Sequence, residues 1–190
     1  AGFTPRMLQR NMEDVDAAAK TIVHRLQEAG PGCDFVTTCA AWLPVKIICD
    51  MMGIPESQHE FVFDMTNIIL SQGDPEFVPE GQNPLEAFLG AGAALAGLID
   101  YIAGQADGSD GDTLTHALVN AEIDGDKLTR DEIQSFFVLL CAAGNETTRN
   151  SISWGLTYLT DNPEQKALLQ SDLDTHMPGA VEEIVRHASP

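Results

Sequence analysis

The chain has 190 residues, of which 44% are hydrophobic and 21% are charged. That balance is typical of a globular domain with a hydrophobic core, and it excludes an intrinsically disordered chain. The 29 acidic residues outnumber the 10 lysines and arginines, which gives a formal net charge of −19. We therefore expect no nucleic-acid partner, because a nucleic-acid-binding protein needs a basic surface to neutralise phosphates.

The hydropathy pattern does not predict a membrane span. The longest uninterrupted apolar run is Phe136 to Ala143, which is far shorter than the roughly 20 residues that a spanning helix needs. No signal-peptide pattern opens the chain, so we expect a cytoplasmic protein. The chain begins without Met, and both ends fall next to predicted helices. We therefore expect residues 1–190 to be part of a longer protein.

The first predicted helix begins at Thr4-Pro5, an N-cap residue followed by a proline at the first helical position. Apolar residues then recur at alternating spacings of three and four as far as Leu26, and Gly30-Pro31-Gly32 ends the helix. Residues 34–38 are predicted to form one short extended segment.

The rest of the chain is predicted as a succession of helices separated by glycines, prolines and capping residues. One of these helices begins at Pro55 and ends before a loop at residues 73–84. The others cover residues 42–52, 85–105, 112–121, 129–160, 163–171 and 180–187. Gly90, Gly92 and Gly97 inside one helix would be explained by close packing against a neighbour. Strands do not alternate with helices, so the predicted fold class is all-α, mostly helical.

The helix predicted at 129–160 has the clearest start signal. Thr129 and Glu132 form a capping box, and no helix breaker follows until Asn162-Pro163. Such a helix is about 48 Å long at 1.5 Å per residue, whereas the mean α-helix has about 11–12 residues. A helix of this length crosses the whole domain, so we expect its middle to be buried.

The middle of this helix breaks the expected pattern. An apolar run to Ala143 is followed by seven residues that are not apolar, Gly144 to Asn150. Polar residues in a position expected to be buried indicate a functional site. Thr147 can bond a helix carbonyl or a ligand, and Glu146 can carry protons, so we expect a local distortion of the helix there. The alternative is a surface strip with a Glu146–Arg149 ion pair.

Other candidate sites are weaker. Glu183 and Arg186 are spaced to meet on one helix face, which alone is a common surface salt bridge. The four cysteines match no zinc pattern. Residues 107–112 lack the ligand spacing of an EF-hand, so they are predicted to form a solvated turn.

Together, two of these motifs resemble one known family. Ala143-Gly144-Asn145-Glu146-Thr147-Thr148 in a very long helix resembles the oxygen-binding helix of the cytochrome P450 family, and Glu183-x-x-Arg186 resembles the Glu-x-x-Arg motif of its next major helix. Asn162-Pro163-Glu164-Gln165 resembles the start of the intervening helix, and Phe3-Thr4-Pro5-Arg6 resembles the segment after the third main helix. The resemblance covers essentially the whole chain. It implies a partial cytochrome P450 fold in which residues 1–190 are a single helical segment, truncated at both ends.

The resemblance also implies roles for individual residues. Glu146 and Thr147 would be catalytic, Glu146 relaying protons and Thr147 stabilising iron-bound oxygen, while Glu183 and Arg186 would be a structural pair. The positions expected at the haem are Leu140, Ala143, Gly144, Thr147 and Thr148. The positions expected to face substrate are Leu139, Ala142 and Ala143, and the region 55–105 would form the lid of the substrate pocket.

The family's iron ligand is a Cys in a Phe-x-x-Gly-x-x-x-Cys-x-Gly loop, which is expected beyond Pro190, so no metal ligand is expected in this chain. The implied whole enzyme is a soluble, bacterial-type haem-thiolate monooxygenase. It would insert one atom of O2 into a sterol, terpenoid or other lipid-like apolar substrate, with electrons from NAD(P)H through a ferredoxin-type donor. The chain alone would be inactive. The alternative is a non-catalytic, all-helical ligand-binding or interaction domain, favoured by the missing ligand loop.

Overall fold

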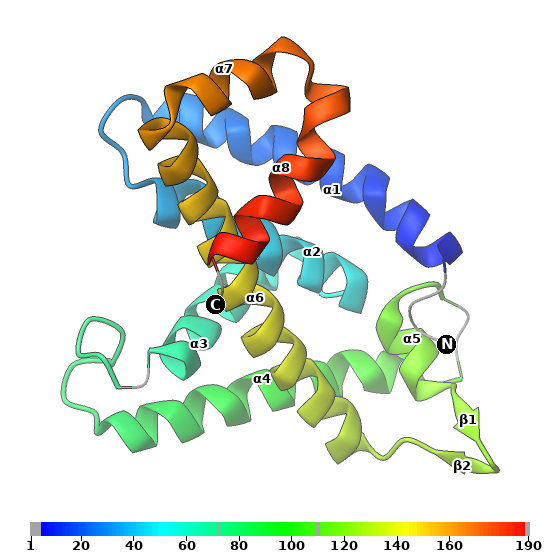
Figure 1. Cartoon of the computed structure of the whole chain (residues 1–190). Helices are drawn as coiled ribbons and strands as arrows, with labels where there is room; N and C mark the ends of the chain where they lie inside the picture. Colours follow the sequence, from blue (N-terminus) through cyan, green and yellow to red (C-terminus); the bar gives the residue numbers. More distant parts are fainter. Residues whose placement is uncertain (1–4, 72, 109–110, 189–190) are drawn as a thin grey trace.

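The structure is a computed structural model that describes residues 5–71, 73–108 and 111–188. Helices account for 78% of the chain, which confirms the predicted all-α class. The α-helices in Figure 1 are α1 (Pro5–Ala29), α2 (Trp42–Met52), α3 (His59–Leu70), α4 (Pro84–Ala106), α5 (Leu114–Val119), α6 (Arg130–Asp161), α7 (Pro163–Ser171) and α8 (Leu173–Ala188). A π-helical turn covers Val36–Ala40, and a 3₁₀ turn covers Glu56–Gln58.

One short hairpin is the whole β-structure of the described residues. Strand β1 (Glu122–Ile123) pairs antiparallel with β2 (Asp126–Lys127). The turn between them needs two left-handed residues, and Asp124 and Gly125 have φ values of 54° and 93°. The hairpin lies immediately before α6, so it sets the point where the long helix begins.

The hydrophobic core lies where the first half of α6 packs against α2, α3, α4 and α5. Its largest fully buried side chains include Met52, Leu95, Leu114, Ile133 and Phe137. The Thr115 hydroxyl donates a 2.6 Å hydrogen bond to the carbonyl of Met52, which satisfies a free carbonyl in the last turn of α2. Helix α5 thereby fixes the end of α2.

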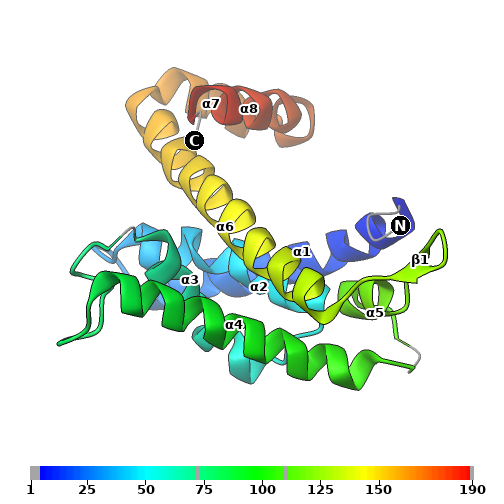
Figure 2. The same cartoon turned by 90° about the horizontal axis from the view of Figure 1, so that it is seen from below.

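Helix α6 is one continuous α-helix of 32 residues, as its sequence predicts. The capping box is present: the Glu132 backbone N–H donates to Thr129 Oγ1 at 3.3 Å, and the Thr129 backbone N–H donates to Glu132 Oε2 at 2.8 Å. Figure 2 shows that α6 rises out of the layer formed by α1 to α5 and carries α7 and α8 at its far end. Only its first half therefore crosses the core.

An aromatic stack holds α1, α2 and α3 together. The rings of Trp42 and Phe63 lie 4.6 Å apart and 3° from parallel. The guanidinium of Arg25 lies 4.5 Å from the centre of the Trp42 ring, a cation–π contact. These contacts anchor α3 to the helices that precede it.

Two segments differ from their predictions. Residues 35–38 are helical, not extended, because Asp34 Oδ1 accepts hydrogen bonds from the backbone N–H groups of Val36 (2.8 Å) and Thr37 (3.1 Å) and starts a helical turn. The last helix begins at Leu173, not at Ala180. Asp172 caps its first turn through Thr175 (3.1 Å to the backbone N–H), and Pro178 lies inside the helix, where it removes one backbone donor.

Helix α4 buries one row of residues against α3 and α6, including Ala91, Leu95 and Ile99. Close packing does not explain its interior glycines within the described part of the chain, because a Cβ built at Gly90, Gly92 or Gly97 meets none of those residues within 4 Å. No membrane-spanning helix was predicted, but the length and composition of α4 alone would allow it to cross a membrane. A core helix passes the same test.

Some predictions fall on residues that the structure does not describe. They are the N-cap at Thr4, the Phe3-Thr4 part of the motif Phe3-Thr4-Pro5-Arg6, and Ser109 and Asp110 of the predicted solvated turn.

Candidate functional site

The sequence predicted that the middle of α6 is buried, but its polar stretch is buried on one face and exposed on another. Leu139, Ala143 and Thr147, four residues apart, are exposed on one face. Cys141 and Asn145 are buried on another face. The helix stays α-helical throughout, so the expected distortion in the form of a π or 3₁₀ turn at Glu146 or Thr147 is absent.

The Thr147 hydroxyl donates a 2.8 Å hydrogen bond to the carbonyl of Ala143, one turn earlier on α6. Thr147 and Thr148 also line a groove of about 610 Å³ between the second half of α6 and α8. The other lining residues are mostly apolar and come from both helices: Ser151, Ile152, Gly155, Leu156, Leu159, Val181, Ile184 and Val185. The predicted catalytic threonine thus stands at one end of an apolar groove.

Two glycines of α6 allow close approach of neighbouring helices. A Cβ at Gly144 would lie 3.2 Å from Ile48 Cδ1 of α2, and a Cβ at Gly155 would lie 3.1 Å from Ile184 Cδ1 of α8. Both contacts are tighter than an ordinary side-chain contact. In the described residues the open side of Gly144 therefore faces α2.

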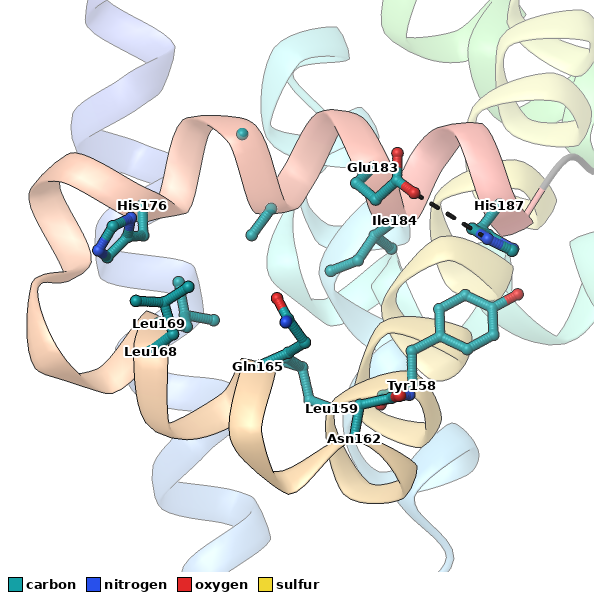
Figure 3. Close-up of a pocket in the computed structure, with 12 residues that line it drawn as sticks. Tyr158, Leu159, Asn162, Gln165, Leu168, Leu169, His176, Glu183, Ile184 and His187 are labelled. Carbon is teal, nitrogen blue, oxygen red and sulfur yellow. Dashed lines mark hydrogen bonds and ion pairs between the residues drawn. The ribbon is translucent and has the colours of Figure 1, made fainter.

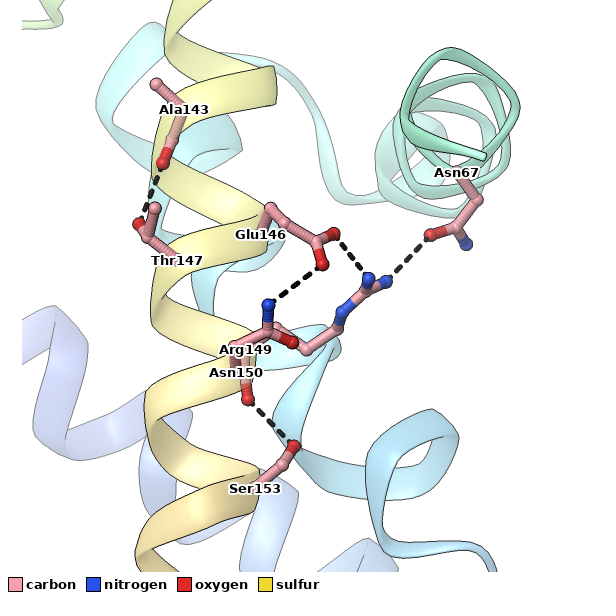
Figure 4. A network of polar contacts seen from close by, with 7 residues as sticks. All are labelled: Asn67, Ala143, Glu146, Thr147, Arg149, Asn150 and Ser153. Atoms are coloured by element: carbon pink, nitrogen blue, oxygen red, sulfur yellow. Dashed lines mark hydrogen bonds and ion pairs between the residues drawn. The ribbon is translucent and has the colours of Figure 1, made fainter. Parts of the chain in front are cut away.

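Glu146 points away from Thr147, toward α3 (Figure 4). Its carboxylate accepts a very short hydrogen bond from Arg149 Nη2 and a 3.0 Å bond from Asn150 Nδ2. Arg149 Nη1 in turn donates to Asn67 Oδ1 of α3 at 3.4 Å. The ion pair that was weighed as the alternative interpretation is present, but both side chains are partly buried, 34% exposed for Glu146 and 20% for Arg149.

Sequence reasoning assigned no role to Asn145, which is fully buried. Neither amide atom of Asn145 has a hydrogen-bond partner among the described residues. Unsatisfied buried polar groups are rare in folded proteins, and each one marks a place where a water or another group is expected. In the sequence, the sign that Asn145 is buried is its spacing: it lies four residues after Cys141, about one helical turn, and so on the same face of the helix.

The buried thiols of α2 and α6 are not poised for metal binding. Burial raises the pKa of Cys49, and it raises the pKa of Cys141 to about 12, against a smaller opposing effect of a hydrogen bond with Thr66. The thiolate is the form that binds metal, so both groups remain neutral thiols at pH 7. All four cysteines are free.

Glu183 and Arg186 meet on α8 as predicted. Arg186 donates from Nε and Nη2 to the two carboxylate oxygens at 2.8 and 2.7 Å, and these hydrogen bonds lower the pKa of Glu183. Glu183 lines a second groove of about 680 Å³ with α7 and the end of α6, which also contains Tyr158 and His187 (Figure 3). In the described residues the pair is exposed and does not line the groove of Thr147.

The outward face of α6 fits one wall of a haem site. Leu139, Ala143 and Thr147 carry no charge, Ala143 keeps the face low, and all three are exposed in the described residues. Leu140 and Ala142, beside this row, are half-buried. The described residues contain no group of three His, Cys, Asp or Glu side chains that could hold a metal ion. The chain can therefore offer a wall and polar groups for a haem.

Comparison with known proteins gives consistent matches. The family model "Cytochrome P450" matches residues 101–187. A methyl-branched lipid omega-hydroxylase of Mycobacterium tuberculosis is 42% identical over 99% of this chain and 44% of its own length. A steroid C26-monooxygenase of Rhodococcus jostii is 34% identical over all of this chain and 38% of its own length. The chain thus spans less than half the length of these curated relatives.

A solved structure agrees with the sequence matches. Cytochrome P450 CYP268A2 of Mycobacterium marinum, in complex with pseudoionone, superposes with a TM-score of 0.89 at 44% identity, over 97% of this chain and 44% of that one. CYP109E1 of Bacillus megaterium, in complex with testosterone, superposes with a TM-score of 0.80 at 26% identity. The match extends over the whole helical arrangement, so the chain is similar to bacterial cytochrome P450s along its full length.

Proposed function

We propose that the protein containing this chain is a haem-thiolate monooxygenase that hydroxylates an apolar, lipid-like substrate. The observation that carries the proposal is 42% identity, over almost the entire chain, to a methyl-branched lipid omega-hydroxylase. The relative that is 34% identical oxidises a steroid at C26 by its name. We therefore propose a methyl-branched lipid or a sterol side chain as the substrate class.

The balanced reaction consumes O2, two electrons, two protons and a C–H bond, and it yields an alcohol and water. A bound haem supplies the iron chemistry that cleaves O2. We propose that Leu140, Ala143, Thr147 and Thr148 form the wall of α6 against that haem, together with the backbone of Gly144, whose open side faces α2. Leu139, Ala142 and Ala143 would face the substrate. Their apolar or small side chains exclude water from the oxidised carbon.

Thr147 and Glu146 are proposed to handle the protons. The Thr147 hydroxyl, which now donates to the Ala143 carbonyl at 2.8 Å, would turn away from that carbonyl to hold a proton on the haem side of α6. Glu146 is the ionisable group next to it on α6, and its carboxylate is reached from the surface because 34% of the side chain is exposed. Relay by a positioned carboxyl is ordinary general acid–base catalysis.

Segments outside this chain are proposed to complete the domain. Several large apolar side chains are exposed along α1, the second half of α6 and α8, among them Met12, Trp154, Leu156, Val181 and Val185. Exposed apolar surface of this kind marks an interface. The missing segments would cover it and supply the iron ligand, and the Glu183–Arg186 pair would help to hold them.

A ferredoxin-type electron donor and a cytoplasmic location are part of the proposal. The net charge of −19 argues against docking on an anionic lipid surface, because like charges repel. An acidic ferredoxin would be repelled in the same way, so the donor is expected to bind outside this segment.

The proposal is tested on the whole protein, purified with haem and supplied with NAD(P)H and redox partners. A methyl-branched fatty acid and a sterol with an intact side chain are compared with a straight-chain fatty acid of equal length. We expect a terminal hydroxylation product from at least one branched substrate, formed faster than from the straight chain. A protein that binds no haem, or that gives no alcohol from any of these substrates, would refute the proposal.

A further inference from the structure

The side-chain amide of Asn145 is buried in α6 without a protein partner. Its exposed fraction is 0%, and neither Oδ1 nor Nδ2 has a hydrogen-bond partner among the described residues. The amide offers two donor hydrogens and an acceptor oxygen. A buried polar group left without any partner raises the unfolding equilibrium constant by roughly five- to hundredfold, so such groups are nearly always bonded to protein or to ordered water.

The Asn145 amide is not satisfied by its own helix. Asn120 and Asn162 each donate from Nδ2 to the carbonyl four residues earlier, at 3.0 and 2.9 Å. The hydroxyl of Thr147 bonds in the same way, at 2.8 Å. Asn145 makes no such bond to the carbonyl of Cys141. A partner for its amide therefore has to lie between α6 and a neighbouring helix.

That neighbouring helix is α3. Cys141, Asn145 and Arg149 follow one another at intervals of four residues, so they form one row along α6. At one end of the row, the Cys141 thiol lies within hydrogen-bonding reach of the Thr66 hydroxyl. At the other end, Arg149 Nη1 donates to Asn67 Oδ1 at 3.4 Å. Since Thr66 and Asn67 are adjacent on α3, the middle of the row, Asn145, faces the same segment.

Thr66 can supply the second half of a water site. It is 1% exposed, and no N–H or O–H group of the described residues donates to its Oγ1. A buried water needs two to four polar partners, and Oδ1 and Nδ2 of Asn145 together with Oγ1 of Thr66 provide three. The described residues already bury both side chains, so neither a haem nor a segment outside the chain reaches them while α3 stays packed on α6. Water is the ligand that remains.

We propose that Asn145 and Thr66 bind a buried water molecule that bridges α6 and α3. The water donates one hydrogen to Asn145 Oδ1 and the other to Thr66 Oγ1, and it accepts a hydrogen bond from Asn145 Nδ2. The site lies on the buried face of α6, whereas Thr147 lies on the exposed face. The inference goes beyond the proposed function and does not depend on it.

The first test is a crystal structure of the whole haem protein at a resolution that shows ordered waters. We expect one water within hydrogen-bond distance of the Asn145 amide and of Thr66 Oγ1, and we expect it to be lost in Thr66→Val. A direct bond between Asn145 and Thr66 without water, or a dry gap between them, would overturn the proposal. The wild-type structure decides this even if a variant does not fold.

The second test is a double-mutant cycle of Asn145→Leu and Thr66→Val, measured by denaturant unfolding. We expect each single variant to raise the unfolding equilibrium constant about fivefold, because it leaves the other group without its water. The double variant should be no less stable than either single one.

Thr115→Val is the matched control, because the buried Thr115 hydroxyl bonds the Met52 carbonyl directly at 2.6 Å. Its effect should simply add to that of Asn145→Leu. Stabilisation by Asn145→Leu, or additive losses in the Asn145 and Thr66 pair, would overturn the proposal. An equally large coupling between Asn145 and Thr115 would overturn it too, because the non-additivity would then not be specific to a shared water.

Discussion

Glu146 and Thr147 are adjacent in α6, but their side chains bond to different partners on different sides of the helix. The Thr147 hydroxyl donates to the carbonyl of Ala143 at 2.8 Å, whereas the Glu146 carboxylate is held by Arg149 and Asn150. No hydrogen bond joins the two side chains directly. A proton that passes from one to the other therefore needs a rotation of Glu146 or a bridging water.

The role proposed for Thr147 is tested by Thr147→Ala in the whole enzyme. We expect substrate binding to stay nearly unchanged, while reducing equivalents are lost as hydrogen peroxide, because the hydroxyl is needed only after O2 binds. The measurement is product and peroxide formed per NAD(P)H consumed. We expect the product yield to fall by about tenfold or less, because water can partly replace the hydroxyl. A complete loss of acid catalysis would lower the yield by roughly 10²-fold.

Thr157→Ala is the matched control for this variant. Thr157 lies on the same helix, and its hydroxyl makes the same type of bond, to the carbonyl of Ser153 at 3.2 Å. It is not in the groove that Thr147 lines. If both variants behave like the wild type, Thr147 serves only in helix packing.

The open glycines of α4 predict a stabilising substitution. Gly97→Ala should raise the free energy of unfolding by up to about 1 kcal/mol, because alanine favours the helix and a Cβ there meets nothing within 4 Å. The contrasting variant is Gly53→Ala. Gly53 has φ of +76°, and its Cβ would lie 2.7 Å from Thr113 Cγ2, so this substitution should lower stability. Denaturant unfolding of both variants checks the prediction. Destabilisation by Gly97→Ala would mean that a segment outside the chain packs on that face of α4.

The capping box of α6 predicts a local effect of Thr129→Ala. Loss of an N-cap hydroxyl costs about 1 kcal/mol, so the amides of the first turn of α6 should exchange about fivefold faster. Hydrogen exchange resolved to that turn is the measurement. Thr113→Ala, which removes the cap of α5, should leave the first turn of α6 unchanged.

The same cap has a pH dependence. The backbone N–H of Thr129, and secondly its hydroxyl, lower the pKa of Glu132 in the folded protein. A depressed carboxyl pKa contributes stability above the unfolded value of about 4.3, and that contribution is lost as the pH falls through the folded value. The protection that wild type shows over Glu132→Gln in the first turn should therefore shrink as the pH falls below about 5. A difference that grows on acidification would contradict this assignment.

Local signals predicted most of the helices because their ends are determined by nearby residues. Thr129 with Glu132, and Gly53 with its left-handed φ, fix a helix start and a helix end by short-range bonds. The prediction was wrong at Asp34, where a side-chain cap was mistaken for an extended segment, and at Pro178, which the first turns of α8 tolerate. In both places an aspartate side chain, Asp34 or Asp172, accepts from the backbone N–H groups of the first turn.

The site shows a different limit. The Gly-x-Glu-Thr-Thr segment could be located from sequence because polar residues interrupt an apolar helix. The direction of each side chain could not, since Glu146 is held by Arg149, which itself donates to Asn67 on another helix. The buried and unpartnered Asn145 likewise depends on the packing of α6 against neighbouring helices. Contacts between distant segments decide both.

The most direct test of the proposed function is the source of the oxygen atom in the product. The whole protein is supplied with NAD(P)H, redox partners and a branched apolar substrate under ¹⁸O₂, and in parallel under ordinary O2 in H₂¹⁸O. The proposed monooxygenase predicts an alcohol that carries one ¹⁸O atom from the gas and none from water. A product labelled from water, or an alcohol formed equally well without O2, would contradict it.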